Sequence, residues 1–218
     1  MARAAEISPS ESVSSEEMDT APPLPEIHLA QTERETRAVN RFWYDIYVAE
    51  MARHRHEADH ASRCLHDPLE NKGHLFYASH EGQVVGSVLT TYLRDTRVGC
   101  YEDLYRLGAL APAVRAVASI TTRLVVRPDK RRTGLVTRLA VATYVQAVMD
   151  GIERTEIDCA EPMVPLFKSL GFRDSVGPAL HPEYGRVRVM RLDLVDLAHL
   201  SAAGSPLARA YTRVMARA

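Results

Sequence analysis

The chain has few cysteines, and nothing in their arrangement suggests pairing. The 218 residues include only Cys64, Cys100 and Cys159, an odd number at wide spacing. Such a set fits neither a disulfide framework nor a paired-cysteine zinc site. Because disulfides are rare in reducing compartments, this composition favours the cytoplasm.

Long apolar runs and an excess of either charge are also missing. No apolar run approaches the ~20 residues that a membrane-spanning helix needs, and the N-terminus has no apolar core of a secretory signal. The 27 basic and 28 acidic side chains give a formal net charge of -1. Without a basic field, nucleic acid is not an expected partner. We therefore expect a soluble cytoplasmic protein with no membrane span.

Aromatic residues are absent from positions 1–25, which are rich in Ser, Glu, Ala and Pro. A segment of this composition cannot bury enough apolar surface to offset the entropy that is lost on ordering. We predict a disordered leader over 1–25 and a single domain over 26–218 that ends in a helix. The length is sufficient for one compact domain with a hydrophobic core.

Apolar periodicity predicts alternating helices and strands after position 26. Strands are expected over 27–30, 74–79, 84–93, 120–126, 155–159 and 187–194. Helices are expected from the capping box at Thr32 to Met51, over 101–117 with a break at Pro112, over 135–149 and over 165–170. The stretch 53–69 is polar and predicts a loop with some helix. A strand, helix and strand over 120–159 predict a parallel pair, so the fold class is a mixed α/β sheet.

The segment RPDKRRTG, between the strand 120–126 and the helix 135–149, has the features of an anion site. Free N–H groups at a helix start attract anions, and Gly134 allows a phosphate to approach the backbone closely. Lys130, Arg131 and Arg132 add positive charge at the same point. The segment is neither a Walker loop nor a dinucleotide fingerprint. The alternative is a basic surface turn before an ordinary helix.

The same segment resembles motif A of the GNAT superfamily of acyltransferases, V-x-P-x-x-[QR]-x-x-G-x-[GA]. Val126, Pro128, Arg131 and Gly134 match the pattern, while Val136 departs from its small last residue. Downstream, LFKSLGF (166–172) is similar to the family's L-Y-x-x-x-G-F. The resemblance implies a sheet of six to seven strands, flanked by helices and splayed at the donor site.

Membership in that superfamily implies that acyl-CoA, or acyl-phosphopantetheine on an acyl carrier protein, is the donor. The strand would bind the pantetheine arm as an added strand, and the loop and helix start would bind its phosphate. The positions that this implies for donor binding are Leu124, Val125, Val126, Lys130, Arg131, Arg132, Thr133, Gly134, Leu135 and Val136. The tyrosine that the family uses to protonate the leaving thiolate falls at Phe167, so that acid is missing here.

The first half of the domain resembles N-acyl amino acid synthases and their relatives, the acyl-homoserine lactone synthases. WYDIYVAEM (43–51) is similar to their R-Y-x-V-Y-x-x-E-M, Asp67 and Glu70 to their acidic pair, and HPEYGRVRVMRLDL (181–194) to their terminal motif. Gly86 lies in the second strand as their glycine does. The acceptor-binding positions that this implies are Trp43, Tyr47, Asp67, Glu70, Arg94 and Arg123. Because Trp43 and Ile120 replace polar residues of the lactone synthases, lactone production is disfavoured.

Candidate proton-transfer groups follow from the predicted position of the thioester. The attacking amine must lose a proton, so a carboxylate or histidine is expected beside the split of the sheet. Glu161 follows the strand 155–159, and His181 and Glu183 lie on the predicted loop before the last strand. Each of them also fits a solvated loop residue. Cys159 is a further candidate, as a nucleophile that would hold the acyl group covalently, although the resemblance implies direct attack by the amine.

The histidine-rich stretch 54–66 includes His56 and His60 at a spacing that can bind zinc on a helix. No further ligand is evident there, so we expect a solvated polar face and no metal.

The preferred function is an N-acyltransferase that moves a medium or long acyl chain to the amine of an amino acid, a peptide or another small metabolite by direct attack. Two alternatives stay open: an acetyl-CoA-dependent N-acetyltransferase, and a non-catalytic domain that binds acyl-pantetheine. An acyl carrier protein and a second copy of the chain are candidate partners.

Overall fold

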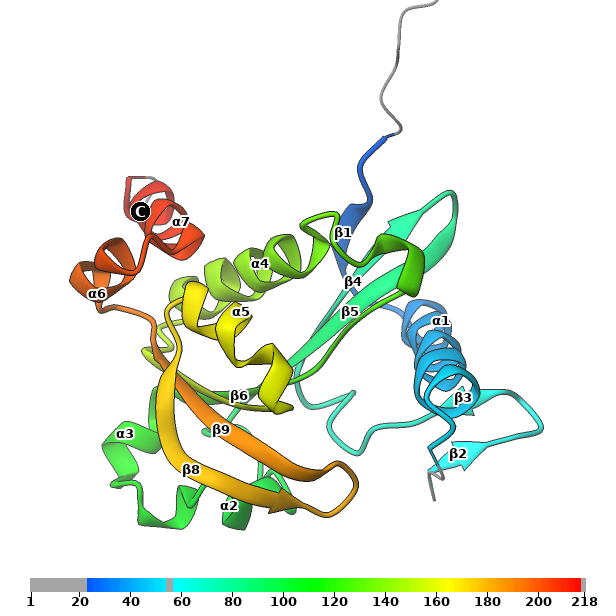
Figure 1. Ribbon diagram of the computed structural model, residues 1–218, viewed down its shortest axis with the longest axis horizontal. Coiled ribbons are helices and arrows are strands. Elements are labelled where there is room, and N and C mark those ends of the chain that lie inside the picture. The colour runs from blue at the N-terminus through cyan, green and yellow to red at the C-terminus, as the bar shows by residue number, and fades with distance from the viewer. Residues whose placement is uncertain (1–22, 54–56, 217–218) are drawn as a thin grey trace, which may run out of the picture.

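Figure 1 shows the computed structural model, which describes residues 23–53 and 57–216. Most of the predicted disordered leader, and His54 and His56, therefore lie outside the described residues. Within the described part, no helix is long and apolar enough to cross a membrane. The three cysteines are free, as the sequence predicts; Cys64 and Cys159 are buried and Cys100 is exposed.

Seven strands form one mixed sheet, which confirms the predicted fold class. In chain order they are β1 (Glu26–Leu29), β4 (His74–His80), β5 (Gln83–Tyr92), β6 (Ala118–Val126), β7 (Arg154–Cys159), β8 (Arg173–His181) and β9 (Gly185–Asp193). Their order across the sheet is β1-β4-β5-β6-β7-β9-β8. The predicted parallel pair is β6 with β7, and the other pairs are antiparallel.

The helices are α1 (Glu33–Trp43), α2 (Tyr101–Leu104), α3 (Pro112–Ala116), α4 (Leu135–Met149), α5 (Val164–Ser169), α6 (Leu197–Ala202) and α7 (Pro206–Met215). The predicted capping box starts α1, where Thr32 and Glu35 satisfy each other's backbone N–H groups. Pro112 is the first residue of α3, so it separates α2 from α3 as expected. The predicted helix to Met51 continues from α1 as a wider π-helix over Tyr44–Glu50.

Helices cover both faces of the sheet (Figure 1). On one face α1 and the π-helix that continues it bury Phe42, Trp43 and Ile46 against strand residues that include Leu89 and Ile120. On the other face α4 packs on β4, β5 and β6. Gly86 of β5 permits this close approach, because a Cβ there would stand 3.1 Å from Cδ1 of Leu139. The glycine is therefore explained by helix packing.

Two stretches differ from the sequence-based expectation. Strand β8 is not among the predicted strands, and its last residue, His181, is predicted to lie on a loop. The strand lies at the edge of the sheet, where a proline is tolerated, and a bulge between Asp174 and Gly177 accommodates the irregular stretch. In the predicted loop with some helix, residues 57–69 contain no helix; they form a short ladder of β2 (Ala58–Asp59) and β3 (Cys64–Leu65).

Candidate active site

The sheet splits between β6 and β7, as the resemblance to the superfamily predicts. The two strands pair only from Ala118 with Arg154 to Ile120 with Glu156, although β6 continues to Val126 and β7 to Cys159. At the point of divergence the hydroxyl of Thr121 lies 3.0 Å from that of Thr155 and 3.2 Å from that of Thr90. The strands separate beyond this point and leave a wedge between them.

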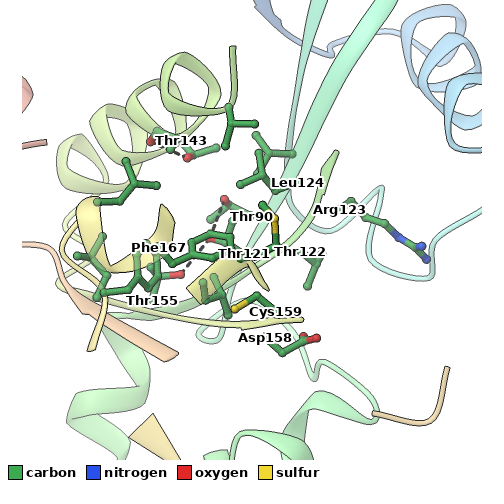
Figure 2. Close-up of a pocket in the computed structure, with 18 of the residues that line it drawn as sticks. Thr90, Thr121, Thr122, Arg123, Leu124, Thr143, Thr155, Asp158, Cys159 and Phe167 are labelled. Atoms are coloured by element: carbon green, nitrogen blue, oxygen red, sulfur yellow. Dashed lines mark hydrogen bonds between the residues drawn. The ribbon is translucent and has the colours of Figure 1, made fainter. Parts of the chain in front are cut away.

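A cavity of about 270 Å³ passes through the split and joins two different environments. At its open side it is lined by polar side chains, namely Arg53, Tyr101, Thr122, Arg123, Asp158 and Tyr184. On the α4 side it is lined by apolar side chains that include Ala147, Phe172, Leu192 and Leu207. In Figure 2, Arg123 and Asp158 extend to one side of the threonine cluster, and Thr143 lies on the other. The wedge thus has a polar mouth and an apolar end.

A bulge in β6 separates these environments. Thr122 pairs with Leu89 and Val125 with Ser87, so β6 has one residue more than β5 at this point. Arg123 adopts a left-handed backbone with φ of 55°. Its guanidinium lies on the α1 side, 5.3 Å from the ring of Trp43, whereas Leu124 lines the cavity. The extra residue therefore turns the charge away from the apolar end.

Buried hydrogen bonds fix the bulge and Arg123. Nε1 of Trp43 donates to the hydroxyl of Ser87 at 2.7 Å, and that hydroxyl donates to the carbonyl of Arg123 at 3.2 Å. Nε of Arg123 lies 2.6 Å from Oδ2 of Asp67, and both side chains are almost completely buried. Burial lowers the pKa of Arg123, but the Asp67 carboxylate more than offsets this, so the guanidinium stays charged.

Asp158 is the half-buried carboxylate of the cavity mouth. It lies near the end of β7, and its Oδ1 accepts a hydrogen bond of 2.5 Å from the hydroxyl of Tyr105. Burial raises the pKa of the Asp158 carboxyl above its usual range, and the Tyr105 hydrogen bond offsets part of that rise. Burial also raises the pKa of Tyr105, which therefore stays protonated and donates. A carboxylate whose pKa is raised is a stronger base than a solvated one, which suits it to accept a proton from a bound group.

The predicted phosphate loop forms a turn before α4. Gly134 has φ of 76° and no side chain caps the helix start. Arg131 donates to the carbonyl of Val126 at 3.0 Å and pairs with Glu50 at 2.8 Å. Lys130 lies 3.6 Å from Asp129. Among the ion pairs that the structure describes, none involves Arg132.

The other donor positions divide by side-chain location. Leu124 and Val136 line the cavity. Val125, Val126 and Leu135 are buried in the cores on the two faces of the sheet, so their side chains do not line the cavity mouth. The hydroxyl of exposed Thr133 donates to the carbonyl of Lys130 at 2.7 Å and closes the turn.

The three proton-transfer candidates from the sequence do not line the cavity. The side chain of Glu161 is 72% exposed and pairs with Arg188 at 3.3 Å. Glu183 is exposed in the turn between β8 and β9. His181 ends β8 and is buried; its Nδ1 accepts from the N–H groups of Glu183 and Tyr184 at 3.0 and 3.3 Å. Its ring stacks on that of Tyr184 at 4.2 Å, so it supports the cavity wall.

Of the predicted acceptor-binding residues, Tyr47 and Arg123 line the cavity and the others do not. Trp43 is fully buried behind the bulge. Glu70 accepts from the backbone N–H of Asp67 at 3.0 Å and so orders the turn that holds that carboxylate. Arg94 donates to the carbonyl of Asp150 at 3.1 Å, beside the C-terminal end of α4.

The geometry does not favour a nucleophilic Cys159. Burial, together with the nearby Asp158 charge, raises the pKa of the Cys159 thiol to about 11, so the thiol is protonated at neutral pH. Phe167 lines the cavity where the superfamily has its tyrosine, and it carries no hydroxyl. Among the described residues, no cluster of histidine, cysteine and acidic side chains could hold a metal ion.

The sequence-based reasoning missed five residues of the mouth: Arg53, Tyr101, Thr122, Asp158 and Tyr184. Asp158 belongs to TEIDC, where alternation alone indicates an ordinary strand residue. The one sequence feature that points to Asp158 is its position directly before Cys159, next to the predicted thioester. Tyr101 and Tyr105 are 57 and 53 residues away in the chain, and only the fold brings them to it.

Comparisons with known proteins agree with this geometry. A family model described as "N-acyl amino acid synthase FeeM" matches residues 38–193. No curated protein matches the sequence. Among solved structures, the CoA-dependent acyl-homoserine lactone synthase BjaI with SAM and isopentyl-CoA is 16% identical, with 86% of this chain and 99% of that chain covered and a TM-score of 0.64. FeeM, an N-acyl amino acid synthase from uncultured soil microbes, is 12% identical over 85% and 99%, with a TM-score of 0.59.

Proposed function

We propose that this protein transfers a medium or long acyl chain from a pantetheine thioester to the amine of an amino acid. The chain belongs to the N-acyl amino acid synthase FeeM family and is therefore an acyltransferase. The observation that carries the proposal is the single cavity whose polar mouth and apolar end meet at the split of the sheet. The mouth suits the reacting groups, and the apolar end suits an alkyl chain. The proposed compartment is the cytoplasm.

The donor arm would lie along β6, with its phosphate at the turn before α4. Coenzyme A and acyl carrier protein share the phosphopantetheine arm, and the proposal covers both. The uncapped N–H groups of α4 and the left-handed Gly134 support a phosphate there. Arg132, for which no ion pair is described, supplies positive charge at the same turn.

The acceptor would bind at the mouth between opposite charges. Arg53 is half-buried, lines the cavity and lies 4.5 Å from the centre of the Tyr184 ring. A guanidinium held in this way suits the carboxylate of an amino acid. Asp158 lines the same mouth and suits its amine. A free amino acid satisfies both charges, which is the reason to prefer it over a peptide.

The ammonium of the bound amino acid first loses one proton to solvent, and direct attack by the neutral amine then requires one further proton to move from nitrogen to sulfur. The amine nitrogen forms a bond to the thioester carbonyl carbon, the carbon–sulfur bond breaks, and the thiolate leaves. The Asp158 carboxylate takes the proton that the nitrogen loses and returns it to the thiolate, so no tyrosine is needed at Phe167. The hydroxyl of Thr122 is buried, lines the cavity and has no hydrogen-bond partner among the described residues, so it is available to donate to the carbonyl oxygen.

A negative charge added at the turn before α4 tests the proposed binding site for the donor phosphate. Gly134→Asp is expected to weaken coenzyme A binding at least tenfold, about 1.4 kcal/mol, because it places a like charge at the phosphate. Aspartate tolerates left-handed backbone better than most residues, so the variant should fold. The measurement is the Kd by calorimetry.

Gly151→Asp is the matched control, because Gly151 has φ of 74°, has equally open surroundings and follows the other end of α4. It should leave the Kd unchanged. Equal Kd values for the two variants would show that the phosphate binds elsewhere.

A donor series tests the function itself. With one amino acid as acceptor, kcat/KM for octanoyl and longer donors is expected to exceed that for acetyl by at least roughly tenfold. Each buried methylene contributes about 0.8 kcal/mol, and an acetyl group would leave the apolar end empty. Thiol release across acetyl to palmitoyl donors gives the profile. A preference for acetyl would return the protein to the acetyltransferase class.

A further inference from the structure

The apolar end of the cavity is closed by a segment that follows the family match. That match ends at residue 193, whereas α6 and α7 span 197–215. Leu207, in the first turn of α7, is 1% exposed and lines the cavity. Figure 1 shows α7 beside α4, and the two helices pack together. The wall opposite the polar mouth therefore includes a residue outside the part that the family model matches.

Three interactions fix this segment to the turn after α5. The hydroxyl of Ser205 donates to the carbonyl of Leu170 at 2.7 Å and caps α7 by accepting from the N–H of Leu207 at 3.2 Å. Nε2 of His199 lies 2.9 Å from the carbonyl of Gly171. Leu200 packs so closely on Gly171 that a Cβ there would stand 2.7 Å from its Cδ2. Leu207 is thus held in a rigid position.

The strand side of the same end is equally well fixed. The hydroxyl of Tyr144 donates to the carbonyl of Leu194 at 2.6 Å, and Leu192, Leu194 and Tyr144 line the cavity with Leu207. All four side chains are at most 3% exposed. Close-packed walls of this kind do not collapse or expand freely when a ligand changes by a methylene. A fixed apolar wall therefore limits the length of the acyl chain that can bind in the cavity.

From this geometry we propose that Leu207 is the end wall of the acyl site and sets the longest acyl chain that the enzyme accepts. The inference rests on the proposed function. An acyl group with its carbonyl at Asp158 extends through the split, past Thr121 and Thr155, with its methyl end toward Leu207. A chain that is too long meets Leu207, and a chain that is too short leaves apolar surface unfilled.

Opposite changes at Leu207 test the inference. Leu207→Ala removes three carbons, so the best donor is expected to become longer by about two carbons. Leu207→Phe fills the end, so the best donor should become shorter by about the same amount. Donors beyond the new limit should lose activity roughly fourfold per methylene, the factor that corresponds to ~0.8 kcal/mol. The measurements are kcat/KM and the Kd of acyl-CoA across the same series.

Leu139→Ala is the matched control. Leu139 is fully buried in α4 and faces β5, away from the cavity. It should cost similar stability and leave the preferred length unchanged. If the wild type prefers long chains but both Leu207 variants keep its optimum, the end wall lies elsewhere and the proposed function stands. If the wild type prefers acetyl, the proposed function fails and this inference fails with it.

Discussion

Replacing Asp158 with asparagine is expected to lower kcat/KM for acyl transfer by roughly 10²–10⁴-fold, the usual contribution of a positioned general base. The amide keeps the size of the side chain and can accept the Tyr105 hydrogen bond, but it cannot take the proton of the amine. Donor binding should be unchanged, because the phosphate turn is at the other end of the arm. Single-turnover rates with a saturating donor would separate these effects.

The stability of this variant provides an independent check. Burial raises the folded-state pKa of Asp158, and a carboxyl with a raised pKa loses stability as the pH rises through that value. Asparagine mimics the protonated form. Asp158→Asn should therefore be at least as stable as the wild type at neutral pH while it loses activity. A variant that loses both would indicate a structural role for Asp158.

Tyr105→Phe should change the pH profile in a defined direction. The Tyr105 hydroxyl stabilises the charged carboxylate, so its removal raises the pKa of Asp158 further. Activity needs the carboxylate, so the acid limb of the kcat/KM profile should move to higher pH. Glu161→Gln is the control, because that side chain is largely exposed outside the cavity. Loss of activity in Glu161→Gln with normal activity in Asp158→Asn would reverse the assignment.

Asp67→Asn is expected to lower the free energy of unfolding by about 3–5 kcal/mol, because it leaves the buried Arg123 guanidinium without its counter-charge. The other described contacts of Arg123 are a 3.3 Å hydrogen bond to the Tyr184 hydroxyl and the rings of Trp43 and Tyr47, none of which is a carboxylate. The bulge in β6 depends on the position of Arg123, so acyl transfer should fall as well. Urea unfolding gives the free energy of unfolding.

The chain offers a matched exposed pair for comparison. Asp45 and Arg63 lie 2.7 Å apart, but more than half of each side chain is exposed. Water and ions screen such a pair, so Asp45→Asn should leave the free energy of unfolding close to that of the wild type. If Asp67→Asn costs no more than Asp45→Asn, the buried pair does not stabilise the fold as argued.

Local sequence features predicted the elements around the turn before α4 well. The proline ring restricts the backbone angles of Pro128, and Gly134 can adopt left-handed angles. The turn before α4 is therefore encoded within a few residues. The capping box of α1 and the parallel pair of β6 and β7 are encoded in the same local way. The strand, turn and helix that frame the proposed donor site were therefore predicted, and the donor-binding positions themselves stay a prediction.

The acceptor side and the cavity end could not be derived in this way. Asp158 acquires its role from burial and from Tyr105, which the fold brings from a distant segment. Leu207 sits in a helix that the sequence marks only as helical, and no local pattern says that it faces a cavity. The edge strand β8 was not predicted, and its pairing with β9 defines it only within the sheet. Tertiary contacts, which are not encoded locally, decide each case.

The mass of the reaction product tests the central claim most directly. The enzyme would be incubated with an amino acid mixture and an octanoyl or longer donor, on coenzyme A in one arm and on acyl carrier protein in the other. The account predicts an N-acyl amino acid in amounts equal to the thiol released in at least one arm, and none without an amine. Thiol release that does not depend on an amine, or a product that carries only acetyl, would contradict it.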